Sequence, residues 1–132
     1  MKKVRMLMFI PNEHPKVIHI ENVQNSVINV LKKHNTDCYG AHAMKIAKNM
    51  YIVYPKLSDI LEYEGTRKYK GDIICGTFLI AKTDDSGYAV SLDYGNLLKY
   101  AHEFWSNAKH SYSECIRSYF NLSYKEFDDF KI

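Results

Sequence analysis

The residues from Asp72 to Ala81, DIICGTFLIA, constrain the fold of this chain more than any other stretch. The run is almost entirely apolar or small, and it is rich in the β-branched residues that favour strands. Gly71 precedes it, and the polar sequence Asp84-Asp85-Ser86-Gly87 follows it as a turn. An apolar run of this length between two turn signals is typical of a buried strand rather than a helix. The sequence therefore predicts a central strand over residues 71–81.

The order of side chains within this run predicts its two faces. Successive side chains of a strand point to opposite faces of the sheet, so Phe78 and Ile80 should lie on the side opposite Leu79. Glycine inside a strand usually marks a bulge or the close approach of a backbone or ligand. Two interpretations of Gly76-Thr77 stay open. A ligand lies over the bare backbone and contacts the Thr77 hydroxyl, or a helix packs closely there.

The N-terminal half reads as strands and one helix. Val4–Ile10 and Lys16–Glu21 are predicted strands joined by a short polar turn, which makes a hairpin. Asn22 is a candidate cap for a helix that ends near Asn35 in a left-handed conformation, with an apolar stripe of Val23, Val27, Val30 and Leu31.

The middle of the chain is less regular. Cys38–Ala43 is either a short strand or a loop that leads into a helical turn over Met44–Lys48. Met50–Tyr54 is a predicted strand closed by Pro55. Residues 56–61 have helical spacing of apolar side chains, and a polar, basic loop follows up to Gly71.

The C-terminal third is predicted to be helical. A first helix follows Ser91, with an apolar stripe of Leu97, Leu98, Ala101, Phe104 and Trp105. Ser111 with Glu114, and Ser123 with Glu126, each match the capping box that begins a helix. The predicted fold class is therefore α+β: a mixed or antiparallel sheet of about four to five strands covered by helices, with a helical C-terminal tail.

The length and net charge of the chain limit its domain count and the classes of function it can have. A chain of 132 residues is expected to form a single domain over 1–132. The net charge of +3, from 18 basic and 15 acidic residues, is too weak and mixed to indicate nucleic acid, and it argues against an acidic DNA mimic. The chain is rich in tyrosine, with 11 residues, and this amphipathic side chain suits interfaces and ligand pockets.

The same composition predicts the compartment. Three widely spaced cysteines do not indicate a disulfide framework, and Cys75 reads as a small core residue. The longest apolar runs are too short to span a bilayer or to act as a signal sequence. We expect a cytoplasmic protein, in the cytosol of a host cell if it is phage-borne, with no membrane partner.

The central run also resembles a known family. The block D-I-I-x-G-T-F-L-I over 72–80 is followed by an acidic turn with glycine, by Ser91-Leu92, and by an amphipathic helix containing L-x-K-Y at Leu97–Tyr100. This pattern is similar to a domain of unknown function found mainly in bacteriophages and mobile elements. The resemblance covers about residues 4–106 and leaves 108–132 as an extension. It implies an α+β fold and a phage or mobile-element setting, and it implies no known reaction.

The chain departs from that family in its middle region. Family members commonly offer N-E-E-G-K followed by an N-R pair, whereas this chain has Tyr54-Pro55-Lys56-Leu57 and then Tyr63-Glu64-Gly65-Thr66-Arg67. A ligand site shared with the family is therefore not implied.

The candidate binding residues lie in the basic loop and the nearby strand. The stretch Tyr63–Lys70 interleaves aromatic and basic residues, and such a surface can neutralise phosphate while a ring stacks on a base. An anionic ligand would lie between this loop and the strand near Gly76. The alternative is a solvated connection without function. The predicted ligand-binding residues are Tyr63, Arg67, Lys68, Tyr69, Lys70, Gly76 and Thr77, with Arg67 making a two-pronged contact to phosphate.

No catalytic or metal-binding residues are predicted, and no cofactor. Cys38 and His42 could form half of a zinc site or a nucleophile pair, but neither paired ligands nor a cysteine signature accompanies them. Asp84-Asp85 could pair carboxylates for hydrolysis, but beside Ser86-Gly87 they read as turn residues. The glycines are too far apart for a phosphate-binding loop.

The predicted function is a small non-catalytic accessory protein of a phage or mobile element that acts in counter-defence by sequestering an anionic nucleotide-like ligand. An alternative is a nucleic-acid-binding accessory protein, and a third hypothesis is a nucleotide hydrolase. A host protein is a further possible partner. We also expect a homo-oligomer, because the C-terminal residues contain more aromatic surface than a short tail can easily bury, namely Tyr112, Tyr119, Phe120, Phe127 and Phe130.

Overall fold

The computed structural model describes residues 2–60, 63–106, 112–122, 125–127 and 129–130. The described elements, in chain order, are β1 (Lys3–Phe9), β2 (Lys16–Glu21), α1 (Ser26–His34), β3 (Cys38–Ala47), β4 (Met50–Leu57), β5 (Gly65–Tyr69), β6 (Asp72–Cys75), β7 (Phe78–Thr83), β8 (Ala89–Val90), α2 (Tyr94–Glu103), α3 (Tyr112–Asn121) and β9 (Lys125–Glu126).

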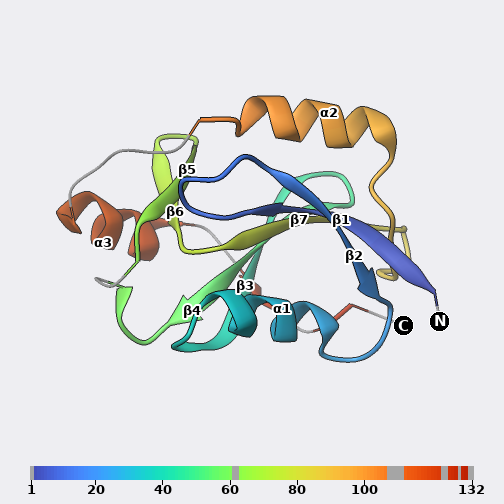
Figure 1. Cartoon of the computed structure of the whole chain (residues 1–132), viewed down its shortest axis with the longest axis horizontal. Helices are drawn as coiled ribbons and strands as arrows, with labels where there is room; N and C mark the ends of the chain where they lie inside the picture. The colour runs from blue at the N-terminus through green and yellow to red at the C-terminus, as the bar shows by residue number, and fades with distance from the viewer. Residues whose placement is uncertain (1, 61–62, 107–111, 123–124, 128, 131–132) are drawn as a thin grey trace.

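An antiparallel sheet forms the centre of the described molecule. Its strands follow the order β2-β1-β7-β4-β3-β9, and β8 pairs with β7 beside this path. Helix α2 crosses one side of the sheet and α1 crosses the other (Figure 1). The fold class is therefore α+β, as the sequence predicted, with an antiparallel sheet.

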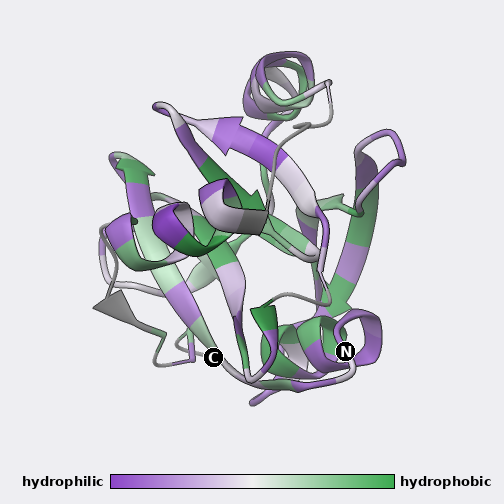
Figure 2. Ribbon diagram, turned by 90° about the vertical axis from the view of Figure 1, so that its left-hand side faces the viewer, coloured by the Kyte–Doolittle hydropathy of each residue, from purple (hydrophilic) through white to green (hydrophobic). Residues whose placement is uncertain are grey.

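Each side of the sheet carries its own buried cluster. Leu79 packs on the α1 side with Val4, Met6 and Leu31. Phe78 and Ile80 pack on the α2 side with Phe9, Leu92, Tyr100 and Phe104. Hydrophobic residues gather along the strands between the two helices (Figure 2). The predicted alternation of Phe78, Leu79 and Ile80 is confirmed.

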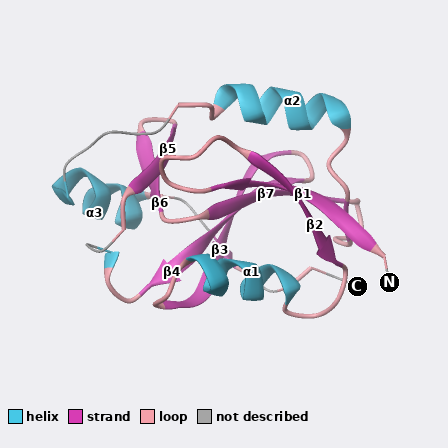
Figure 3. Ribbon diagram, in the orientation of Figure 1, coloured by secondary structure: helices cyan, strands magenta, loops and turns pink. Residues whose placement is uncertain are grey.

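The predicted strand over 71–81 is central, but it is broken in two. Gly76 has a φ of 74°, and the chain changes sheets at this bend. β6 pairs with β5 in a separate two-stranded sheet, whereas β7 joins the main sheet between β1 and β4. Helix α3 lies beside this β5–β6 hairpin (Figure 3).

The N-terminal hairpin is confirmed, but the predicted N-cap of the following helix is wrong. β1 and β2 pair antiparallel. Helix α1 begins after Asn25, which has a φ of 66°, and not after Asn22. Asn35 is the C-cap of α1, as predicted, but it is extended at φ −133° rather than left-handed.

The middle region contains more strand than the sequence predicted. Residues 38–47 are all strand, which settles the open alternative there. Pro55 lies within β4 rather than closing it, because β7 pairs with β4 only over Met50–Val53. The missing Pro55 N–H therefore breaks no bond to β7. The predicted basic loop is wrong for residues 65–69, which form β5.

The C-terminal prediction is half correct. Helix α3 is present, although Ser111 of its capping box lies outside the described residues. The second box fails, since Lys125–Glu126 form strand β9 beside β3; Ser123 also lies outside the described residues. Phe127 and Phe130 pack against the α1-side cluster, whereas Phe120 is 78% exposed.

Candidate functional site

A cleft opens where α2, the β5–β6 hairpin and the end of β3 meet. Its volume is about 260 Å³. β3 contributes Ile46 and Ala47. The remaining lining residues are Lys68 and Tyr69 of β5, Lys70 of the following turn, and Lys99, Tyr100 and Glu103 of α2. The cleft thus unites three predicted site residues with a helix about thirty residues away in the sequence.

Two lysine ammonium groups lie over the faces of tyrosine rings in this cleft. Lys70 Nζ lies 5.4 Å from the centroid of the Tyr69 ring, and Lys99 Nζ lies 5.2 Å from that of Tyr100. Both tyrosine rings stack near Phe104, with centroid distances of 6.1 Å and 6.4 Å. A cation over a ring face is attracted by the electrons of that face. The rings therefore hold two ammonium groups at the cleft.

The charge of the cleft is positive. The residues that line the cleft include three lysines but only one carboxylate, that of Glu103. Among the described residues, the ion pairs Lys16–Glu13 and Lys82–Asp93 both lie away from the cleft. The three ammonium groups are thus available to an incoming anion.

The β5–β6 turn positions Lys70. Tyr69 and Asp72 pair across the hairpin, which leaves Lys70 and Gly71 as a two-residue turn. Both have positive φ, at 48° and 84°. Two positive values are the mark of a type I′ turn, whose twist matches that of the flanking strands. The turn therefore holds Lys70 close to Tyr69.

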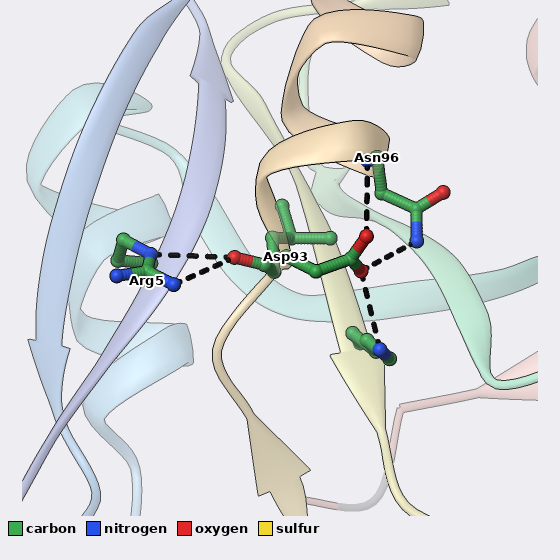
Figure 4. A network of polar contacts seen from close by, with 5 residues as sticks. Arg5, Asp93 and Asn96 are labelled. Carbon is green, nitrogen blue, oxygen red and sulfur yellow. Dashed lines mark hydrogen bonds and ion pairs between the residues drawn. The ribbon is translucent and has the colours of Figure 1, made fainter.

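The N-terminus of α2 is anchored by a polar network that includes Asp93 (Figure 4). The Asp93 carboxylate accepts a bond from the Asn96 backbone N–H at 3.3 Å, and the Asn96 amide and Lys82 Nζ also donate to it. The hydrogen bond from the Asn96 side chain, followed by that from Lys82, lowers the pKa of Asp93 to about 2. This cap ties the helix that carries Lys99 and Tyr100 to strand β7.

Strand β1 forms hydrogen bonds to Leu92, the residue before the Asp93 cap. Arg5 Nε and Nη2 donate to the Leu92 carbonyl at 3.2 Å and 3.1 Å, and the Arg5 N–H donates to Ser91 Oγ. The start of α2 is therefore fixed to two strands of the sheet.

Arg67 lies outside the cleft, and it is buried within β5 rather than exposed in the predicted basic loop. Its exposed fraction is 0%. Its guanidinium donates to the carbonyls of Phe104, Thr66 and Glu13, and it lies 5.5 Å from the Phe9 ring centroid. Burial lowers the pKa of Arg67. The side chain joins three backbone segments, so we exclude it from the site.

Gly76 and Thr77 also lie apart from the cleft. Asn35 fills the space above Gly76: a Cβ there would lie 2.6 Å from Asn35 Oδ1. The Thr77 N–H donates to that oxygen, and the Asn35 amide donates to the Thr77 carbonyl. The space over Gly76 is thus filled by the side chain of Asn35, the residue that follows α1, rather than by the packed face of a helix.

Tyr63 lies beside this junction. Its hydroxyl accepts a bond from the Asp37 N–H at 3.2 Å, and a Cβ on Gly76 would lie 3.5 Å from its ring. Burial, followed by the neighbouring Asp37, raises the pKa of Tyr63. Tyr63 is therefore part of the α1-side packing and does not face the three lysines.

The helix residues of the cleft were missed by the sequence reasoning. Lys99, Tyr100 and Glu103 were treated only as part of an amphipathic helix. The signal available was the pair Lys99-Tyr100 within L-x-K-Y, which repeats the Tyr69-Lys70 combination of the turn in reverse order. Nothing in the sequence alone places these two pairs side by side.

The cysteines and histidines do not form a reactive centre in the described part of the chain. Burial raises the pKa of Cys38, Cys75 and Cys115, and a protonated thiol is a poor nucleophile. A register shift after Cys38 separates it from His42, which packs beside Tyr54 on the other side of the sheet. No group of three or more metal-ligating side chains occurs among the described residues.

Comparisons with protein-family models, curated proteins and solved structures found no match to this chain. The resemblance to a phage domain family therefore stays a prediction. Among the described helices, none is long and apolar enough to cross a membrane.

Proposed function

We propose that the chain binds a small anionic, nucleotide-like ligand in the cleft between α2, the β5–β6 hairpin and β3, and holds it without chemical change. The observation that carries the proposal is the set of three lysine ammonium groups, at Lys68, Lys70 and Lys99, beside two tyrosine rings. Cations with aromatic faces are the combination that recognises phosphate next to a base.

The chemistry of the cleft favours a ligand with both acceptors and donors. Each ammonium group can donate charge-assisted hydrogen bonds to phosphate oxygens, worth roughly 1.5–3 kcal/mol apiece. The Glu103 carboxylate can only accept hydrogen bonds when ionised, so it suits a ribose hydroxyl or a base N–H. A phosphate that attracts Lys70 away from the Tyr69 ring would leave that ring free to stack on a base.

The size of the cleft favours a small ligand over a strand of nucleic acid. Its volume of about 260 Å³ is slightly below the roughly 300–1,000 Å³ of typical ligand pockets. A single nucleotide would be partly enclosed, whereas a strand needs a groove that continues past the cleft.

The proposed role is sequestration. A binder that does not convert its ligand lowers the free concentration of that ligand. This action would suit a phage or mobile-element protein that blunts a nucleotide signal of its host, which is the function expected from the sequence.

The test is titration calorimetry with a panel of nucleoside monophosphates and cyclic nucleotides. K68A/K70A should weaken binding by at least tenfold, since two cations leave the cleft. K32A/K33A is the matched control, because it removes the same charge from exposed positions of α1 on the other side of the sheet. An equal loss of nucleotide affinity in both variants, or no nucleotide binding by the wild type, would contradict the proposal.

Two further readouts separate the alternatives. Ligand recovered unchanged by chromatography after denaturation supports sequestration, whereas recovered product indicates a hydrolase. An affinity that grows with strand length and falls steeply with salt indicates a nucleic-acid-binding protein.

A further inference from the structure

The two edges of the main sheet differ in whether a further strand covers them. Strand β3 forms one edge of the path, and β9 covers it at His42 and Ala43. Strand β2 forms the other edge and pairs with β1 alone in the described part of the chain. An edge strand presents unpaired N–H and C=O groups that can template pairing with another strand.

β2 lacks the features that usually protect an edge. Its register with β1 runs without a bulge from Lys16 to Glu21, and it contains no proline. Its charged residues are at its two ends, and the residues between include Val17, Ile18 and Ile20. Such a strand can pair with another strand along its open edge.

An exposed apolar surface lies on the α2 side of this edge. Val17 is 48% exposed and pairs with Leu7, which belongs to the α2-side cluster, so Val17 is on that side of the sheet. Tyr94 and Leu98, one turn apart on α2, are 75% and 55% exposed.

Trp105 extends this surface towards the β1–β2 turn. It follows α2, is 51% exposed and stacks on His14 with ring centroids 4.5 Å apart. His14 belongs to the turn between β1 and β2. This flank of α2 therefore faces the β2 edge, whereas Lys99 and Glu103 line the cleft.

We propose that a second copy of this chain covers the surface, through antiparallel pairing of the two β2 strands about a two-fold axis. The two copies then form one continuous sheet, with both α2 helices on the same side. The aromatic side chains of each copy fill the groove between those helices. Such an interface uses the same patch on both copies, as closed two-fold dimers do.

Charge favours this arrangement. Antiparallel pairing brings the Lys16 end of one strand towards the Glu21 end of the other, whereas parallel pairing would bring like charges together. Lys16 already contacts Glu13 at 2.6 Å, but both side chains are about half exposed, so this surface pair leaves Lys16 free to shift.

The surface area that this pairing would bury is also sufficient for a stable dimer. An aromatic side chain buries roughly 150–250 Å². Covering Tyr94 and Trp105 in both copies would remove on the order of 500 Å² from water before Val17, Leu98 and the strand backbones are counted. A stable interface needs about 1,000 Å² in total, which the pairing of two strands of this length brings within reach.

Sedimentation velocity on the full chain over a wide concentration range tests the proposal. The wild type should sediment as a dimer, and V17K or L98K should raise the dimer dissociation constant at least tenfold. F120K is the control with the same charge change on α3, and it should alter the constant less than twofold. A circular dichroism melt of each variant shows that it is folded.

Hydrogen exchange provides a second measurement that needs no variant. The amides of residues 16–21 should become more protected as the protein concentration rises. A wild type that stays monomeric overturns the proposal, and the edge is then either open or reserved for a strand of another protein. A dimer that F120K dissociates and V17K does not would also overturn it, and would place the interface at the C-terminal residues.

Discussion

Burial gives Arg67 a structural role. A guanidinium has five donors in a fixed planar fork, and three segments of backbone supply acceptors for it here. The end of α2, the β1–β2 turn and β5 are thereby joined at one side chain. The neighbouring Lys68 and Lys70 are exposed, so adjacent basic residues take different roles according to which face of the hairpin they occupy.

Replacing Arg67 by alanine should lower the free energy of unfolding by more than about 3 kcal/mol, because buried carbonyls lose their donors and a cavity remains. Urea denaturation at neutral pH measures the change. R117A on α3 removes an exposed arginine and should cost less than about 0.5 kcal/mol. An R67A protein as stable as the wild type would show that Arg67 is not a structural residue.

Gly76 should not tolerate a side chain. Its φ of 74° disfavours other residues, and a Cβ would lie 2.6 Å from Asn35 Oδ1. G76A should therefore destabilise the protein by about 1–3 kcal/mol. G95A is the control: in α2 the nearest atom to the new Cβ lies 3.5 Å away, and alanine should stabilise the helix by up to about 1 kcal/mol. Thermal melts of both variants should shift in opposite directions, and a loss of stability in G95A alone would contradict this account.

Local sequence could identify these residues as unusual without giving their roles. Gly76 inside an apolar run indicated a bend or a close contact, and it proved to be both. The burial of Arg67 could not be read from its basic neighbours, since it depends on carbonyls more than thirty residues away in the sequence. Lys99 lies about thirty residues from Lys70 in the sequence, so the α2 side of the cleft was not predictable from local patterns.

Among the elements, α2 connects the stability of the fold to the cleft. It is held at its start by Asp93 and at its end by packing of Phe104 on Phe9 and Phe78. Lys99, Tyr100 and Glu103 lie between these two anchors. A change that loosens either end should therefore disturb the cleft.

The cap of α2 should depend on pH. The pKa of Asp93 is lowered to about 2 in the folded protein, below its ordinary value of 3.8. Its contribution is thus present above about pH 4 and is lost as the pH falls towards 2. Melting temperatures of the wild type and D93N, followed by circular dichroism, should differ at pH 5 and converge by pH 2. A difference that stays constant over this range would show that the charge of Asp93 does not stabilise the helix.

Strand and helix assignments were most reliable where hydrophobic periodicity was strong. The strands at β1, β2, β4 and β7 and the helices at α1, α2 and α3 were predicted. β5 was missed because its sequence, GTRKY, is polar and short, and a buried arginine occupies one of its inward positions. β9 was missed because a two-residue strand has no pattern of its own and depends on the exposed edge of β3.

At the scale of the whole molecule, the bend at Gly76 produces the cleft. It separates β6 from β7, so the β5–β6 hairpin leaves the main sheet and its turn approaches α2. The fold class followed from the order of elements, but this departure did not, since a single apolar run crosses both sheets. The opposite flank of α2 carries the exposed surface assigned to a second copy, so ligand and partner would use different sides of one helix.

The most direct test of the ligand site is a titration followed by NMR with uniformly ¹⁵N-labelled protein. The nucleotide that gives the largest thermal shift is added in steps, and the backbone amide shifts are mapped onto the sequence. We predict concentration-dependent changes at residues 46–47, 68–71 and 99–103, with little change at Tyr63, Gly76 and Thr77. Changes centred on Tyr63 and Gly76, or no saturable change at any nucleotide concentration, would contradict the assignment of the cleft.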